Sequence, residues 1–120
     1  MPRPSMRDDI SEVFAALADS TRRKLYERLL ESPSGRTATE LSEGALVSRQ
    51  AIVKHLQVLT KTGLAEVRRH GREARYFVSG SGTLGASKWL EDSAAAWDRR
   101  LGALEKKIQA TARKPKHANN

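Results

Sequence analysis

The chain contains no cysteine among its 120 residues. Without thiols it can form neither disulfides nor thiolate metal sites, and it cannot sense oxidants through a thiol. Its three histidines, His55, His70 and His117, share no helical spacing that suits a metal ion. We therefore predict that the chain has no metal site and uses no cofactor.

Long apolar runs are also missing. No stretch approaches the roughly 20 apolar residues that a membrane-spanning helix needs, and residues 1–6, which include two prolines, lack the apolar core of a signal peptide. We therefore expect a cytoplasmic protein with no membrane partner. Aromatic residues are only 5% of the chain and hydrophobic residues 38%, which is a lean core for one small domain. Two copies that share apolar surface are a reasonable expectation.

Motifs of catalysis are absent as well. The sequence has no phosphate-cradling glycine-rich loop, no nucleophile elbow and no HExxH motif. The pairs Asp8-Asp9 and Glu91-Asp92 are better explained by helix capping and solvation than by acid–base chemistry, because adjacent helical residues point about 100° apart. We predict that the chain is not an enzyme.

Positive charge is what the chain has in excess. The net charge is +8 and the isoelectric point is near 10.3. Seven basic residues and only two acidic ones lie between residues 48 and 78. Clustered lysines and arginines raise the local attraction to phosphate, so this segment predicts a polyanionic partner.

Two helices are predicted in the first third of the chain. The first begins near residue 8, and its apolar residues have the i, i+3, i+4, i+7 spacing of a buried face. The second follows an N-cap at Asp19 or Ser20 and ends at the Pro/Gly cluster 32–35. The apolar face of the first helix comprises Ile10, Val13, Phe14 and Leu17. In the second, we expect Leu25, Leu29 and Leu30 to face inward, whereas Arg22, Arg23 and Arg28 do not.

A helix-turn-helix pattern follows. Residues 37–40 read as a Thr-Ala-Thr-Glu capping box for a short helix that ends near Gly44. Ser48 caps the next helix, which is expected to stop at Gly63 in a left-handed C-cap. At 100° per residue, this helix has one aliphatic side and one polar side. The aliphatic side carries Ile52, Leu56 and Leu59, and the polar side carries Gln50, Lys54, Gln57 and Lys61.

A basic hairpin comes next. Residues 64–69 and 74–78 alternate well enough for two strands, and residues 70–73 form the turn between them. Residues 79–82, which read Ser-Gly-Ser-Gly, are expected to be a flexible connector. The hairpin carries four arginines, Arg68, Arg69, Arg72 and Arg75.

The last predicted helix spans residues 84–112 and carries a heptad seam with spacings of 4, 3, 4, 3 and 4. A single domain rarely needs so long a seam, so we predict a homodimer contact through this helix, assisted by the first one. Trp89 and Trp97 would also suit a ligand pocket, but packing in the core or dimer is favoured. The predicted interface comprises Ile10, Val13, Phe14, Leu90, Ala94, Trp97, Leu101, Leu104 and Ile108.

Together these segments predict a mainly α fold with a small β-hairpin, that is, a winged helix-turn-helix. A flexible arm (1–6) precedes a DNA-binding domain (7–82), a dimerisation helix (83–112) and a disordered basic tail (113–120). A polar-faced helix followed by a basic ribbon suits the major groove of double-stranded DNA and its phosphates. The alternative is a winged helix that binds an acidic protein. The outward amides and amines disfavour it, because a protein-docking face should expose more apolar groups.

Residues 17–23 and 54–64 resemble the two signature stretches of the ArsR-type winged-helix repressors, and residues 75–78 resemble the end of that family's wing. The likeness is close over about residues 10–80. It implies a homodimer on an inverted repeat that blocks transcription until an effector changes its affinity. It places DNA contacts on Ser48, Arg49, Gln50, Lys54 and His55, and backbone contacts on the four wing arginines. Gln57, on the same polar side of the helix, is also predicted to bind DNA.

The chain departs from the metal-sensing branch of that family. In that branch a cysteine pair follows Glu-Leu in the third helix, whereas here Glu40-Leu41 is followed by Ser-Glu-Gly. The other known site uses Asp and His across the paired last helices, and residues 84–112 contain no histidine. The sequence is compatible with three classes of effector: a small apolar molecule, a partner protein, or a metal held by oxygen ligands.

Overall fold

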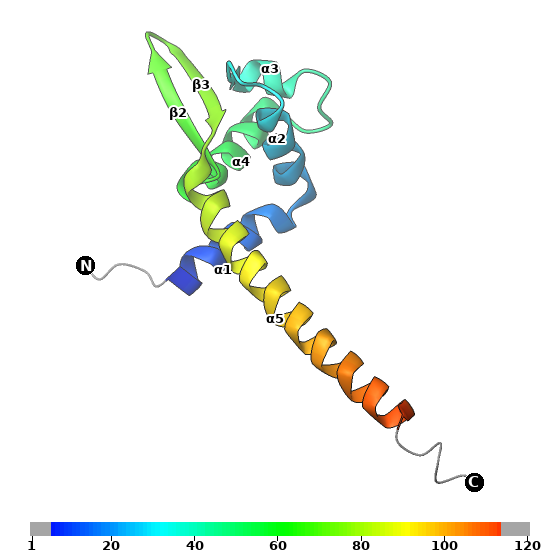
Figure 1. The fold of residues 1–120 in the computed structure, drawn as a ribbon. Coiled ribbons are helices and arrows are strands. Elements are labelled where there is room, and N and C mark those ends of the chain that lie inside the picture. The colour runs from blue at the N-terminus through cyan, green and yellow to red at the C-terminus, as the bar shows by residue number, and fades with distance from the viewer. Residues whose placement is uncertain (1–5, 114–120) are drawn as a thin grey trace. The chain divides into compact units, whose positions relative to one another are not determined.

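The computed structural model describes residues 6–113 (Figure 1). The predicted arm and tail lie outside these residues, except for Met6 and Arg113, which belong to helices. The predicted order of four helices, a hairpin and a last long helix is confirmed. The elements are α1 (Met6–Ala18), α2 (Ser20–Leu30), β1 (Arg36–Thr37), α3 (Ala38–Ser42), α4 (Arg49–Lys61), β2 (Ala65–His70), β3 (Glu73–Val78) and α5 (Gly80–Arg113).

The helix starts predicted from the capping residues are confirmed. Asp19 Oδ1 accepts a hydrogen bond from the Arg22 N–H at 3.0 Å and begins α2. Thr37 and Glu40 form the complete capping box at the start of α3. The Ser48 hydroxyl accepts from the Ala51 N–H at 3.1 Å and begins α4. Each cap satisfies an N–H group that has no partner within its own helix.

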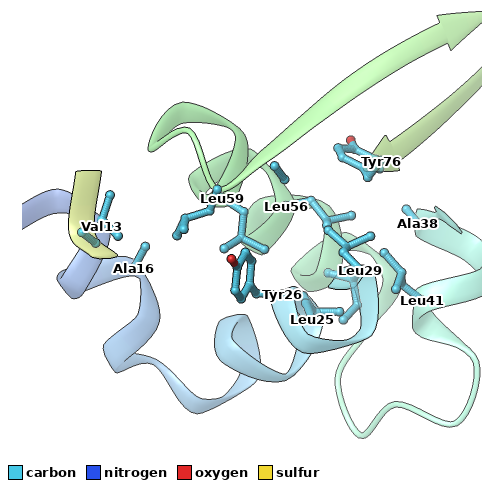
Figure 2. Packing of buried hydrophobic residues seen from close by; sticks show 14 residues of the cluster. Val13, Ala16, Leu25, Tyr26, Leu29, Ala38, Leu41, Leu56, Leu59 and Tyr76 are labelled. Atoms are coloured by element: carbon cyan, nitrogen blue, oxygen red, sulfur yellow. The ribbon is translucent and has the colours of Figure 1, made fainter. Parts of the chain in front are cut away.

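The core lies between α2, α3 and α4. Figure 2 shows Leu29 and Tyr26 of α2 close to Leu56 and Leu59 of α4. Leu30 is 52% exposed, so its predicted inward orientation is wrong. Its neighbours Leu25 and Leu29 are one helical turn apart and share the buried face, whereas Leu30 points about 100° away. The fully buried side chains are Leu29, Leu41, Ile52, Leu56, Leu59 and Leu64.

Three arginines of α2 bind backbone carbonyls at helix ends. Arg22 Nε donates to the Ala16 carbonyl at 2.9 Å, and Arg23 Nη1 donates to that of Leu17 at 2.7 Å. Arg28 Nη1 donates to the Leu41 carbonyl at 2.7 Å. The last carbonyls of a helix lack intrahelical partners, so these cations stabilise the ends of α1 and α3. None of the three arginines is buried, which agrees with the prediction that they do not face inward, but their side chains serve the fold.

A third strand, β1, was not predicted from the sequence. It pairs with β3 of the hairpin and completes a three-stranded sheet. The sheet order is β1-β3-β2 and both pairs are antiparallel. Arg36 of β1 lies opposite Tyr76 of β3, and Val67 of β2 lies opposite Tyr76 on the other side. Two residues are too few to show the alternation that reveals a strand. The turn is tight, and Gly71 at φ 63° adopts a left-handed conformation there.

The predicted flexible connector is wrong, because residues 80–82 form the first turn of α5. The Gly82 N–H donates to the Gly63 carbonyl at 2.8 Å, and the Ser79 N–H donates to the Leu64 carbonyl at 3.0 Å. The helix therefore begins against the C-terminal turn of α4. Glycine at position 82 permits this close backbone approach rather than flexibility.

The described residues form two compact units, 6–86 and 87–113. The first contains the sheet, α1 to α4 and the start of α5. Ile10 and Val13, two predicted dimer contacts, are 8% and 3% exposed within the single chain. They therefore offer little surface to a second copy, which corrects that part of the predicted interface.

The second unit, over the residues that the structure describes, is the rest of α5. Its predicted seam is exposed along its length, from Leu90 at 51% to Ile108 at 59%. Trp97 is the most exposed of the large apolar seam residues at 62%. Between residues 6 and 113, no helix combines the length and the apolar character needed to cross a membrane. Because its side chains are exposed, the seam is available to a partner.

We predict that the capping box makes folding stability sensitive to acid. Hydrogen bonding to the Thr37 backbone N–H, aided by the cations of Arg75 and Arg36, lowers the pKa of Glu40 below 4.5. A lowered folded-state pKa adds stability above the unfolded value, and this is lost as the pH falls through the folded value. In Glu40→Gln, which keeps an oxygen acceptor, urea midpoints measured between pH 5 and about pH 2 should fall less steeply. An unchanged slope would contradict this role for the carboxylate.

Candidate nucleic-acid interface

The outward face of α4 is polar and exposed to solvent. Gln50, Lys54, Gln57 and Lys61 are exposed, and their side chains have no hydrogen-bond or ion-pair partner within residues 10–112. The opposite face of the helix is buried in the core. The predicted division of this helix into an aliphatic side and an amide-and-amine side is therefore confirmed.

A groove separates α4 from the hairpin. Its volume is about 830 Å³, and α4, both long strands and the start of α3 line it. Four cationic side chains and one carboxylate contribute to the lining, so the groove is electropositive. The charged residues are Arg49, Lys61, Arg69, Arg72 and Glu73. A concave cationic surface next to an exposed polar helix can hold a phosphate backbone while the helix contacts bases.

The alternation of the strands divides the four wing arginines. Arg69 lies in β2 two residues after Val67, and both line the groove. Arg72 lies in the hairpin turn and also lines it. Both arginines are exposed, and neither has a side-chain partner in the described part of the chain. Their charges are therefore available to an external anion.

Arg68 and Arg75 lie opposite each other on the other face of the sheet. Arg68 Nη2 is 2.6 Å from Glu66 Oε1, and its guanidinium stacks 4.3 Å from the centre of the Phe77 ring. Arg75 donates to the Gly35 carbonyl at 3.1 Å and lies 3.6 Å from Glu40. Both cations already have acceptors in their own chain. The four wing arginines, all predicted to contact the DNA backbone, therefore fall into two unlike pairs.

The remaining predicted contacts lie along α4. Ser48 uses its hydroxyl as the N-cap, and Arg49 Nε donates to Thr39 Oγ1 at 3.1 Å, which holds the side chain against α3. His55 is half-buried, and its Nδ1 lies 3.5 Å from Nη1 of Arg22. Its ring thus packs toward α2.

Lys61 is a cationic groove residue that the predicted site left out. It follows Gln57 by four residues, so the helical period alone places both on one face. Three threonines also line the groove, and nothing in their sequence spacing indicates this. They are Thr37, Thr39 and Thr60. Among the described residues, no group of three or more His, Cys, Asp or Glu could hold a metal ion.

Comparisons with known proteins agree with this geometry. A family model described as a helix-turn-helix domain matches residues 17–68. A probable mercury resistance operon repressor of Streptomyces lividans is 38% identical over 71 residues, which are 59% of this chain. An uncharacterized HTH-type transcriptional regulator of Bacillus subtilis (strain 168) is 37% identical over 73 residues, 56% of this chain. The chain spans 55% of the first relative's length and 78% of the second's.

A solved structure extends the likeness to most of the fold. The ArsR-like transcriptional regulator from Rhodococcus sp. RHA1 is 39% identical and superimposes with a TM-score of 0.70. The match covers 83% of this chain and 92% of that one. The chain therefore belongs to the ArsR-like family of winged helix-turn-helix transcriptional regulators.

Proposed function

We propose that the chain is a sequence-specific DNA-binding repressor that acts as a homodimer on an inverted-repeat operator. One observation carries the proposal. The exposed amide-and-amine face of α4 borders a cationic groove whose other wall is the wing. This arrangement offers a helix to the major groove and cations to the phosphates beside it.

The two surfaces have different tasks in this proposal. Gln50 lies in the first turn of α4 and is exposed, and a glutamine can form a bidentate contact with adenine. Lys54, Lys61, Arg69 and Arg72 supply positive charge to phosphates. Phosphate contacts give affinity without sequence information and make binding strongly dependent on salt.

The dimer is proposed to form through the exposed seam of α5. We assign DNA binding to residues 6–86 and pairing to residues 87–113, following the two compact units. This division moves the boundary of the DNA-binding part four residues beyond the predicted position 82. Two-fold symmetry would then place two half-sites about one helical turn, roughly 10 base pairs, apart on the operator.

The effector is proposed to differ from a thiolate-bound metal ion. The Streptomyces relative is described as a mercury resistance operon repressor, but the present 120 residues contain no cysteine. Soft metals such as mercury prefer thiolate ligands. A small molecule is therefore the class to test first, by titration into a preformed complex of protein and DNA.

Replacing Gln50 by alanine should relax sequence discrimination. After operator selection from random duplexes, the variant should lose roughly 1–3 kcal/mol of preference at one position of each half-site. Affinity for random DNA should stay close to that of the parent, because glutamine carries no charge. Fluorescence anisotropy on the selected duplex and on single-base variants measures both quantities.

The exposed Gln109 of α5 provides a matched control. Gln109→Ala removes the same side chain from the second unit and should leave discrimination intact. Equal weakening of specific and random DNA by Gln50→Ala would show that Gln50 reads no base. Failure of the parent protein to bind any duplex at low salt would overturn the proposed function itself.

A further inference from the structure

The side of α4 that faces away from the core has two stripes. Gln50 and Lys54 form one of them; both are exposed, and neither lines the groove between α4 and the wing. The other stripe lines the groove, and its residues recur every four positions along the helix. They are Arg49, Val53, Gln57 and Lys61. Arg49 is therefore adjacent to Gln50 in sequence but belongs to a different surface.

A residue of α3 holds Arg49 in the groove. Arg49 Nε donates a hydrogen bond to Thr39 Oγ1 at 3.1 Å, and Thr39 lines the same groove. The bond joins the first turn of α3 to the first turn of α4. Both residues are exposed, and neither belongs to the hydrophobic core. The packing of the fold therefore does not depend on this contact.

The far end of the Arg49 guanidinium is free. A guanidinium has five N–H donors in a planar fork, and the bond to Thr39 uses the one on Nε. Within residues 10–112, Nη1 and Nη2 have no partner. These two nitrogens can donate together to two oxygens of one phosphate. Thr39 thus fixes one end of the side chain and leaves the phosphate-binding end open.

The neighbours of Arg49 favour a phosphate over a base. The groove also contains the cations of Lys61, Arg69 and Arg72, against the single carboxylate of Glu73. Clustered cations attract the DNA backbone, which carries the negative charge of the duplex. The amide of Gln50 and the amine of Lys54 lie outside this cluster. Arg49 is therefore placed with the residues suited to phosphate contacts rather than with those suited to base edges.

We propose that Thr39 is a positioning residue for DNA binding, whose hydroxyl holds the Arg49 guanidinium in the groove so that Nη1 and Nη2 clamp a backbone phosphate. The inference rests on the proposed function and adds to it one phosphate contact and the residue that prepares it. Ordering a long side chain before DNA arrives reduces the conformational entropy lost on binding. Thr39 acts through Arg49 and does not contact the DNA itself.

Thr39→Val tests the positioning role, because valine keeps the shape of threonine and removes the hydroxyl. Affinity should fall roughly threefold to tenfold for each subunit, by the same factor for the selected operator duplex and for random duplexes. Thr39→Ser, which keeps the hydroxyl, should restore it. Fluorescence anisotropy measures all three proteins. A loss confined to the operator duplex would show that Arg49 reads a base and would overturn the phosphate assignment.

A double-mutant cycle tests whether Thr39 acts through Arg49. Arg49→Ala should weaken binding to all duplexes and lower the salt slope by about one for each subunit. Adding Thr39→Val to Arg49→Ala should cause no further loss, because the group that Thr39 positions is already gone. A further loss as large as that of Thr39→Val alone would show that Thr39 contacts DNA independently, which contradicts the proposal.

Thr60→Val is the matched control. Thr60 lines the same groove, but its hydroxyl donates to the Leu56 carbonyl of its own helix at 2.8 Å. This variant should keep the affinity and the salt slope of the parent. Thermal midpoints establish that both valine variants are folded. Equal losses of affinity in Thr39→Val and Thr60→Val would attribute the effect to the polarity of the groove and refute a specific role for Thr39.

The hydrogen bond can also be tested without DNA, by NMR of the arginine side chains. The Arg49 Nε–H should exchange with solvent more slowly than that of Arg69, and Thr39→Val should abolish this protection whereas Thr39→Ser keeps it. If the parent shows the protection but binds no duplex, the proposed function fails and the contact stands. If the parent binds DNA and Thr39→Val changes neither exchange nor affinity, the positioning role fails and the proposed function stands.

Discussion

Replacement of Gly82 by alanine is expected to lower the free energy of unfolding by roughly 3 kcal/mol. A Cβ atom at position 82 would lie 2.6 Å from the Thr62 carbonyl oxygen and 2.9 Å from the Gly63 carbonyl carbon. Both are backbone atoms, which cannot rotate away as the end of a side chain can. The start of α5 would have to move away from the C-terminal turn of α4.

The C-terminal turn of α4 cannot easily move instead. Gly63 adopts φ 79°, and the Leu64 N–H donates to the Leu59 carbonyl at 2.9 Å, which closes the end of α4. Leu59 and Leu64 are fully buried. Displacement of this turn would disturb the core as well as the hydrogen bond between Gly82 and Gly63. The expected cost is therefore that of overpacking against a fixed backbone.

Gly85 is the matched control for this substitution. It lies in the same helix three residues later, and a Cβ atom there meets nothing within 4 Å. Gly85→Ala should stabilise the protein by about 1 kcal/mol, because alanine favours a helix more than glycine does. Urea unfolding followed by circular dichroism at 222 nm distinguishes the two. Similar effects of the same sign in both variants would refute the proposed close approach.

The second large effect concerns the groove. Arg69→Ala combined with Arg72→Ala should weaken DNA binding on the order of 100-fold, with about one unit lost from the salt slope for each phosphate contact removed. A dimer presents each side chain twice, so the slope could fall by about 4. These arginines have no partner in the described part of the chain. The measurement is anisotropy with a fixed duplex from low to moderate salt.

Arg68→Ala combined with Arg75→Ala removes the same net charge and is the control. These side chains already contact Glu66, Phe77, Gly35 and Glu40. The salt slope should change much less than in the groove variant, whereas the thermal midpoint should fall because Arg75 connects β3 to the start of α3. Equal losses of slope in both variants would show that only total charge matters and would refute the assignment of the two faces.

Much of the candidate site could be predicted from the local sequence. Ser48 begins α4, and the 100° period places Gln50, Lys54 and Gln57 opposite the buried aliphatic residues. A capping side chain binds an N–H group three residues away, and helical periodicity repeats within one turn, so neither needs a distant partner. The division of the wing arginines was also accessible, because Arg68 and Arg69 are adjacent in a strand and must point to opposite faces.

Other features depended on segments that are far apart in the chain. Arg28 binds the end of α3 and Arg75 binds the loop at Gly35, 40 residues away. The sequence alone does not distinguish a basic residue that faces solvent from one that caps another helix. Net charge therefore overstated the number of cations available to DNA.

By itself, the sequence determined the order of the helices, the positions of their caps, the polar face of α4 and the heptad seam of α5. Each of these is encoded by spacing over a few residues. The tertiary structure alone decided that α5 begins against Gly63, that β1 joins the hairpin, and that Arg75 binds the Gly35 carbonyl 40 residues away. Those outcomes depend on contacts between segments that are far apart in the sequence. The spacing of residues along the chain does not reveal such contacts.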